Sequence, residues 1–202
     1  MWYWVERIYV WCRRCGHSRG FGVQSPWAYR FIRYVVSEHY PYYAYEDLNG
    51  RFQHEGRLAM KLGRFYFRLS NFVQPTLIAD FAPVTSAYRE CFQAGCWHSR
   101  VLTIMSGHSM EEYARSLSGV SLLNIVRLSF SSCWREFLEV ALTKCSSDSV
   151  FVFEGIYESD ESLLFWKTFI QDKRVGITFD LYYCGVAFFD KSFVKQDYFI
   201  NF

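Results

Sequence analysis

From Thr76 to the end of the chain, short apolar runs alternate with helical patterns, and this alternation limits the possible folds more than any other feature. The apolar runs have the length and composition of buried strands, and the segments between them have the spacing of amphipathic helices. We expect strands at residues 77–80, 100–105, 122–128 and 149–153, and helices at residues 86–93, 110–117, 133–142 and 161–170. Repeated strand–helix units predict a three-layer α/β sandwich with a mostly parallel sheet.

The pattern changes near the C-terminus, where strands follow each other without a helix between them. Residues 175–184 and 185–190 are typical of a closing antiparallel hairpin, and residues 196–202 of a last strand. The run SVFVF at residues 149–153 is unbroken and apolar, as expected of a central parallel strand.

The first third of the chain has a helical pattern instead. We expect a short helix at residues 1–15, a loop rich in Gly, Ser and Arg at residues 13–26, and a helix that Pro26 begins and Pro41 ends. Tyr42, Tyr43 and Tyr45 cluster around the next turn, and another helix is expected at about residues 55–72. The chain is therefore divided into a helical N-terminal cap at residues 1–72 and an α/β domain at residues 73–202.

Composition excludes a disordered chain, because 51% of the residues are hydrophobic and 21% are aromatic. Charge is uneven: residues 1–70 hold 11 Lys and Arg against 5 Asp and Glu, a net charge of +6, although the whole chain carries only +2. Such a basic segment can contact RNA or an anionic membrane, but a solvated helical face is the more common reason for it. We therefore expect no nucleic-acid partner.

The seven cysteines do not form a recognisable metal or disulfide framework. Cys12 and Cys15 make one CxxC pair with no second pair at zinc-finger spacing, so no metal site is expected. Scattered reduced thiols are typical of a cytoplasmic protein. The apolar first twelve residues include Glu6 and Arg7 and are too short to span a bilayer, so we expect no transmembrane segment.

The segment QPTLIADFAPVTSAYRECF, residues 74–92, has the layout of a nucleotide-cofactor site. A buried strand carries the acid Asp80 at its end, and a tight turn then leads into a helix. Such turns favour glycine, which allows positive φ and a close approach of the backbone to the ligand. Here Ala82, Pro83 and Ser86 occupy the turn instead.

Three segments resemble class I S-adenosylmethionine-dependent methyltransferases, in particular a small O-methyltransferase-like group of Bacteroidetes-type bacteria. They are GFGVQSPWAYRFIRYVVSEHYPYYAYEDL (residues 20–48), FRLSNFVQPTLIAD (residues 67–80), and DSVFVFEGIYESDES followed by VGITFDLYYCGVAFFDK and YFINF (within residues 148–202). The resemblance implies a Rossmann-like fold, S-adenosyl-L-methionine as cofactor, and methyl transfer to a small-molecule acceptor of unknown identity.

The resemblance also assigns site residues and shows where this chain departs from the family pattern. Asp80 matches the acid that precedes the donor-binding turn, while Ala82 and Ser86 stand where the family has glycines. Met105 stands where the family has the acid that binds the ribose hydroxyls. By the same resemblance a strand–helix unit is shortened after it, and Leu128 and Ser129 stand where the family has a further acid.

The candidate catalytic residues are Glu154, which follows the SVFVF strand, and Tyr157 just beyond it. Glu154 is a candidate base or metal ligand, although a single carboxylate makes a poor magnesium or calcium site. Asp80 is a candidate contact of the donor's amino group, or alternatively a cap of the turn after its strand. These residues support two functions: a divergent methyltransferase, or an inactive homologue that acts as a binding or structural partner. A homo- or hetero-oligomer is compatible with both. A basic-segment module that binds RNA or a membrane is a third and less favoured hypothesis.

Overall fold

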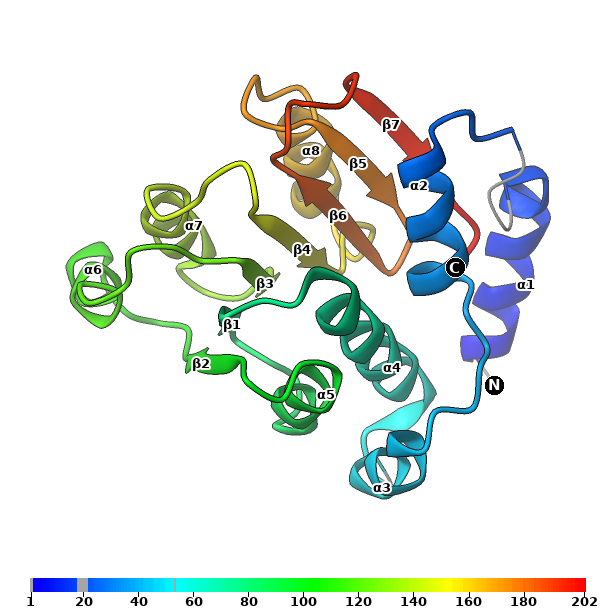
Figure 1. Ribbon diagram of the computed structural model, residues 1–202, viewed down its shortest axis with the longest axis horizontal. Helices are drawn as coiled ribbons and strands as arrows, with labels where there is room; N and C mark the ends of the chain where they lie inside the picture. The colour runs from blue at the N-terminus through cyan, green and yellow to red at the C-terminus, as the bar shows by residue number, and fades with distance from the viewer. Residues whose placement is uncertain (1, 18–21, 53) are drawn as a thin grey trace. The chain divides into compact units, whose positions relative to one another are not determined.

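A computed structural model describes residues 2–17, 22–52 and 54–202. The described residues do not include Met1, residues 18–21 or residue 53. Residues 18–21 belong to the expected loop, and they overlap the start of the first of the three resembling segments. The chain packs as two compact units (Figure 1). We call residues 1–74, 84–99 and 199–202 the helical unit, and residues 75–83 and 100–198 the sheet unit. The expected division at residues 72 and 73 stays a prediction.

The helical unit contains the helices that the sequence predicts and one that it does not. Its elements are α1 (Trp2–Arg14), the 3₁₀ turn η1 (Cys15–His17), α2 (Pro26–Phe31), the π-helical η2 (Ile32–Val36), α3 (Ala44–Arg51), α4 (Gly56–Val73) and α5 (Ala87–Gly95). Ser25 caps α2, since its hydroxyl accepts a hydrogen bond from the amide of Ala28. Helix α3 was not predicted because it has no side-chain cap and contains Asn49 and Gly50, which are weak helix formers.

Helix α4 supplies the core of the helical unit. Its apolar stripe is buried at Leu62, Phe65 and Leu69, as the 3,4 spacing predicts. Helix α5 lies against α4 so closely that a Cβ at Gly95 would come within 2.1 Å of the carbonyl oxygen of Phe67. Glycine at this position therefore permits the close approach of the two helices.

The sheet unit is built on a seven-stranded sheet with the order β2-β1-β3-β4-β6-β5-β7. The strands are β1 (Leu77–Phe81), β2 (Arg100–Ile104), β3 (Ile125–Ser129), β4 (Val150–Glu154), β5 (Ile177–Asp180), β6 (Cys184–Phe188) and β7 (Gln196–Phe199). Strands β2, β1, β3 and β4 are parallel, and β6 is antiparallel to both β4 and β5. The predicted Rossmann-like fold class, with a mostly parallel sheet and a C-terminal antiparallel hairpin, is confirmed.

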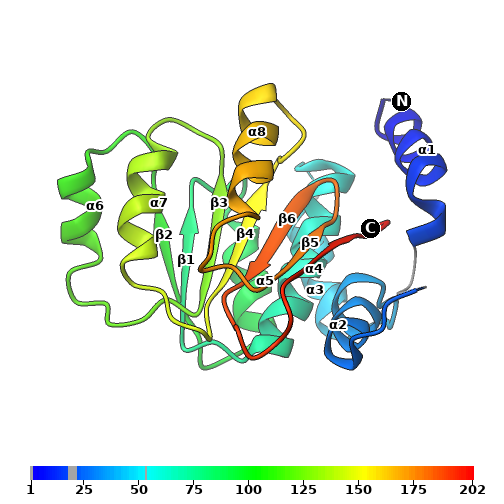
Figure 2. The same ribbon diagram turned by 90° about the horizontal axis from the view of Figure 1, so that it is seen from above.

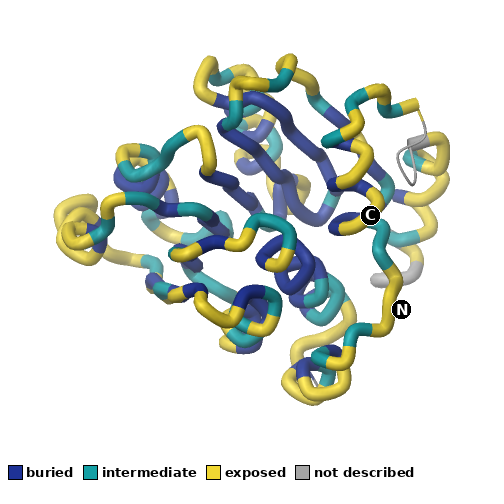
Figure 3. The backbone as a smooth tube through the Cα atoms, in the orientation of Figure 1, coloured by how far each residue is buried: buried dark blue, intermediate teal, exposed yellow. Residues whose placement is uncertain are grey.

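One face of this sheet is covered by α6 (Met110–Ser116), α7 (Trp134–Leu142) and α8 (Asp160–Phe169) (Figure 2). Ala79 and Phe81 of β1 belong to the apolar core beneath these helices, and the ring of Phe81 stacks on Phe137 with centroids 4.4 Å apart. The five inner strands β1, β3, β4, β6 and β5 are almost entirely buried, whereas the edge strands β2 and β7 are partly exposed (Figure 3). Because side chains alternate along a strand, Asp80 points to the opposite face of the sheet.

Only helix α6 lies between β2 and β3 in the described chain, and β3 pairs directly with β1. Strand β2 therefore forms one edge of the sheet. No described helix is long and apolar enough to cross a membrane.

Candidate functional site

The candidate site lies where the parallel strands β1, β3 and β4 end. Strand β1 continues one residue beyond its predicted end, so Asp80 is its penultimate residue and Phe81 its last. The turn that follows is fixed to both neighbouring strands: the amide of Ala82 donates to the carbonyl of Ile104 at 2.8 Å, and its carbonyl accepts from Ser129 Oγ at 2.9 Å. The turn after β1 is thus held by hydrogen bonds to the ends of β2 and β3.

Ala82 adopts φ of 48°, in the left-handed region that favours glycine. The turn after β1 therefore has a conformation typical of glycine at a position that carries alanine. A left-handed conformation costs an L-residue roughly 1–2 kcal/mol, so this turn stores strain in the backbone.

Replacing Ala82 by glycine is expected to raise the free energy of unfolding by about 0.5–1 kcal/mol, because relief of the strain exceeds the extra freedom of glycine in the unfolded chain. Urea denaturation would measure the change. Ala79→Gly in the preceding strand β1 is the control and should lower stability, since this buried residue lies within a regular strand. If both variants lowered the free energy of unfolding equally, the backbone at Ala82 would not be strained.

Arg127 occupies the centre of the site, and the sequence analysis did not select it. Its Nη1 donates to Asp80 Oδ1 at 3.1 Å and to the carbonyl of Phe81 at 2.9 Å. Its Nε and Nη2 donate to Glu154 Oε2 at 3.0 and 2.7 Å, and Nη2 also donates to Ser129 Oγ at 2.7 Å. These five hydrogen bonds match the five N–H groups of a guanidinium, so Arg127 is fully satisfied.

Strand register explains this cluster. Asp80 lies opposite Arg127 in the β1–β3 pairing, and Ser129 lies opposite Glu154 in the β3–β4 pairing. Side chains two residues apart on a strand share a face, so Arg127 and Ser129 point to the same side as their neighbours. We call Asp80, Arg127 and Glu154 the buried charge cluster.

The buried charge cluster holds two carboxylates and one cation away from solvent. The side chains of Arg127, Asp80 and Glu154 are 0%, 1% and 10% exposed. The pKa of Asp80 is raised to about 6, mainly because the carboxyl is buried; Arg127 lowers this pKa and Glu154 raises it, and neither outweighs burial. Asp80 Oδ2 is buried without a hydrogen-bond partner in the part of the chain that the structure describes.

The other predicted residues lie in different surroundings. Met105 is 63% exposed, and its carbonyl accepts from the hydroxyl of Tyr113 at 3.3 Å. Ser86 precedes α5 in the helical unit and makes no side-chain hydrogen bond to its helix.

Tyr157 lies near the hairpin between β5 and β6. Its hydroxyl donates to Asp180 Oδ2 at 2.7 Å, and its ring stacks on Tyr182 with centroids 4.9 Å apart. Asp180 Oδ1 also accepts from the amide of Tyr182 at 2.9 Å, and Tyr182 itself has φ of 70°. Asp180 thus orders the hairpin turn and Tyr157 together.

The structure therefore joins Asp80, Ala82 and Glu154 through Arg127 and Ser129. The sequence contained a signal for Arg127: it is the one charged residue in the apolar run LLNIVRL. A charged residue within a buried strand needs a partner, and Asp80 and Glu154 also end buried strands. Among the described residues, no group of three or more His, Cys, Asp or Glu is placed to hold a metal ion.

Comparison with known proteins relates this fold to methyltransferases. No protein-family model and no curated protein sequence matches the chain. A methyltransferase from Geobacter sulfurreducens superposes with a TM-score of 0.50 at 13% identity, covering 79% of this chain and 94% of that one. The O-methyltransferase from Bacillus cereus in complex with SAH gives a TM-score of 0.51 at 11% identity, covering 77% and 94%. At these identities the likeness shows a shared fold.

Proposed function

We propose that this chain is an S-adenosyl-L-methionine-dependent methyltransferase of class I that transfers a methyl group to a small-molecule acceptor. The left-handed turn at Ala82 carries the proposal, because a chain that had lost its cofactor would have no reason to keep a strained turn there. The same proposal makes the chain a divergent member of the small O-methyltransferase-like group of Bacteroidetes-type bacteria.

The residues present fit the cofactor in two respects and depart from it in one. Asp80 Oδ2 is a buried acceptor without a partner among the described residues, as an ammonium group would require. Ala82 provides the turn, with Ser86 further along it. Met105, however, cannot accept the strong hydrogen bonds that a ribose diol donates to a carboxylate.

In this proposal Asp80 holds the amino group of the cofactor, and the turn at Ala82 holds its carboxylate. The bound cofactor supplies an electrophilic methyl group. Glu154 takes the proton from the acceptor, or Tyr157 takes it while passing its own hydroxyl proton to Asp180 Oδ2. Binding places the acceptor next to the methyl group, and this positioning promotes the transfer. The cytoplasmic location expected from the reduced cysteines belongs to the proposal as well.

Calorimetric titration with S-adenosylhomocysteine tests cofactor binding. The variant Met105→Asp tests whether a carboxylate at this position strengthens that binding. The added carboxylate should strengthen binding about tenfold or more, because a hydrogen bond to a charged group contributes roughly 1.5–3 kcal/mol. Met105 is 63% exposed, so the substitution should not disturb the fold.

Met110→Asp is the matched control, since Met110 is also exposed and lies five residues further along the chain. It should leave the affinity unchanged. Saturable binding that tightens only in Met105→Asp supports the proposal. Absence of binding up to millimolar concentration in both the parent chain and Met105→Asp would overturn it.

A second candidate function is an inactive homologue that acts as a binding or structural partner. The buried charge cluster favours it, because Arg127 neutralises Asp80 and Glu154 internally and leaves less charge for a ligand or acceptor. Such a protein could assemble with itself or with a competent methyltransferase. Turnover of any acceptor, detected as formation of S-adenosylhomocysteine, would exclude this alternative.

A further inference from the structure

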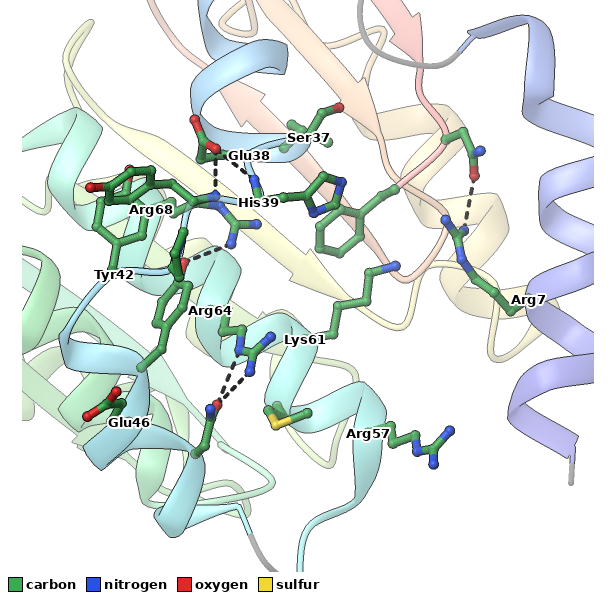
Figure 4. A pocket seen from close by; sticks show the side chains of 18 of the residues that line it. Arg7, Ser37, Glu38, His39, Tyr42, Glu46, Arg57, Lys61, Arg64 and Arg68 are labelled. Carbon is green, nitrogen blue, oxygen red and sulfur yellow. Dashed lines mark hydrogen bonds between the residues drawn. The ribbon is translucent and has the colours of Figure 1, made fainter.

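The helical unit contains a cavity of about 1200 Å³ that the proposed methyl transfer does not use (Figure 4). It is lined by α1, the segment after η2, α3, α4 and the last two residues of the chain. All of these segments belong to the helical unit. The cavity can therefore be considered without reference to the sheet unit.

Four cations of α4 form a stripe along this cavity: Arg57, Lys61, Arg64 and Arg68. Their spacing of four, three and four residues places them on one helix face. Arg57 is exposed, Lys61 and Arg64 are half-buried, and Arg68 is buried, so the stripe leads from solvent into the unit. Figure 4 shows these side chains with Arg7 of α1, which binds Asn201 Oδ1 at 3.0 Å.

Arg68 is buried without a counter-charge. It is 6% exposed, and its Nε and Nη1 donate to the carbonyl of Val35 at 2.6 Å and the hydroxyl of Tyr45 at 3.0 Å. Both acceptors are neutral, and no carboxylate of the described residues forms an ion pair with Arg68. Burial of an unpaired charge is costly, so this position favours an anion.

The lining of the cavity is positive overall. Five basic side chains line it, the α4 stripe and Arg7, against two acidic side chains, Glu38 and Glu46. Glu38 is already engaged, because its Oε1 accepts from the amides of His39 and Tyr40 at 2.7 Å each. A ligand with a single negative charge would leave most of this excess uncompensated.

Aromatic rings line the same cavity. Tyr40, Tyr43 and Trp11 are 61%, 93% and 55% exposed, although large rings are normally covered. Tyr42 lies between the rings of Tyr40 and Tyr45, with centroids 5.3 and 5.4 Å away. The cavity thus offers apolar ring surface beside its cations.

We propose that this cavity binds a small molecule that carries a phosphate monoester on an aromatic body. A phosphate monoester has a charge of about −1.5 to −2 and three acceptor oxygens, which suit the forked donors of Arg64 and Arg68. Arg64 Nε and Nη2 donate to Asn49 Oδ1 at 3.2 and 2.8 Å, and Nη1 is left to donate to the ligand. A concave cavity is better suited to binding a small molecule than to binding the surface of a macromolecule. This site goes beyond methyl transfer and does not depend on it.

Titration of the full chain with phenyl phosphate, followed by calorimetry, tests the proposal. Phenyl phosphate should bind saturably and about tenfold or more tightly than either phenol or inorganic phosphate, since each lacks one half of the recognised chemistry. Arg64→Gln should weaken the binding about tenfold or more. Arg135→Gln, an exposed arginine that pairs with Glu161 in the sheet unit, is the matched control and should bind like the parent chain.

If Arg64→Gln does not fold, Arg57→Gln tests the proposal instead. Arg57 is exposed at the outer end of the stripe, so its substitution should not disturb the fold. It should also weaken phenyl phosphate binding, by a smaller factor. Equal affinities in Arg57→Gln, Arg64→Gln and Arg135→Gln, or no saturable binding at about 10 mM, would overturn the proposal. Binding to an RNA oligonucleotide or to vesicles of anionic lipid without binding of phenyl phosphate would likewise overturn it, in favour of a macromolecular partner.

Discussion

Arg127→Met is expected to lower the free energy of unfolding by about 3–5 kcal/mol. The substitution keeps an unbranched side chain of similar length but removes the cation that Asp80 and Glu154 share. Two carboxylates would then lie close together in a buried site, each without its main hydrogen-bond donor. Urea denaturation followed by circular dichroism would measure the loss.

Two further variants identify the cause of this loss. Arg135→Met removes an exposed arginine from an ion pair with Glu161 and should cost about 1 kcal/mol or less. The triple variant Asp80→Asn, Arg127→Met and Glu154→Gln removes all three charges of the cluster and should recover much of the stability. If Arg127→Met cost no more than Arg135→Met, the cluster would not contribute to stability in this way.

Asp80 should make the protein less stable as the pH rises from about 4 to 6. Burial raises the pKa of this carboxyl from 3.8 to about 6, so the folded state holds the proton more tightly than the unfolded state does. The stabilisation is fully present below the unfolded value and is lost as the pH rises through the folded value. A shift of this size corresponds to about 3 kcal/mol at ~1.4 kcal/mol per pH unit.

Comparison with Asp80→Asn isolates this effect from the other titrating groups. The difference in unfolding free energy between Asp80→Asn and the parent chain should move in favour of the variant by about 2–3 kcal/mol between pH 4 and 7. Asp148→Asn removes an exposed carboxylate from a turn and serves as the control. Parallel pH profiles for Asp80→Asn and the parent chain would show that Asp80 ionises normally.

Periodicity predicted most of the fold because the chain follows simple patterns locally. The four apolar runs after Thr76 became parallel strands, and the stripe of Leu62, Phe65 and Leu69 became the buried face of α4. Helix α3 was missed because tertiary packing at Tyr45 and Leu48, both buried, outweighs its weak intrinsic propensity. Strand β1 was placed one residue short because an acid usually marks the end of a buried strand.

The candidate site was predicted in part. Asp80 and Glu154 were selected because they follow apolar runs, but their link through Arg127 depends on strand order and register. A single sequence does not contain that pairing explicitly, since the partners are 47 and 27 residues apart. Likewise, the net charge of +6 in residues 1–70 showed an excess of cations, and five of these cations line one cavity in the folded chain.

The buried charge cluster also has a consequence for the order of folding. Arg127 reaches Asp80 on β1 and Glu154 on β4, so its charge is compensated only when both neighbours of β3 are in place. A partly formed sheet of β3 with one neighbour would bury a guanidinium with half of its partners, which disfavours such an intermediate. The three central strands should therefore assemble and separate together, and amide hydrogen exchange should show one common opening free energy for β1, β3 and β4.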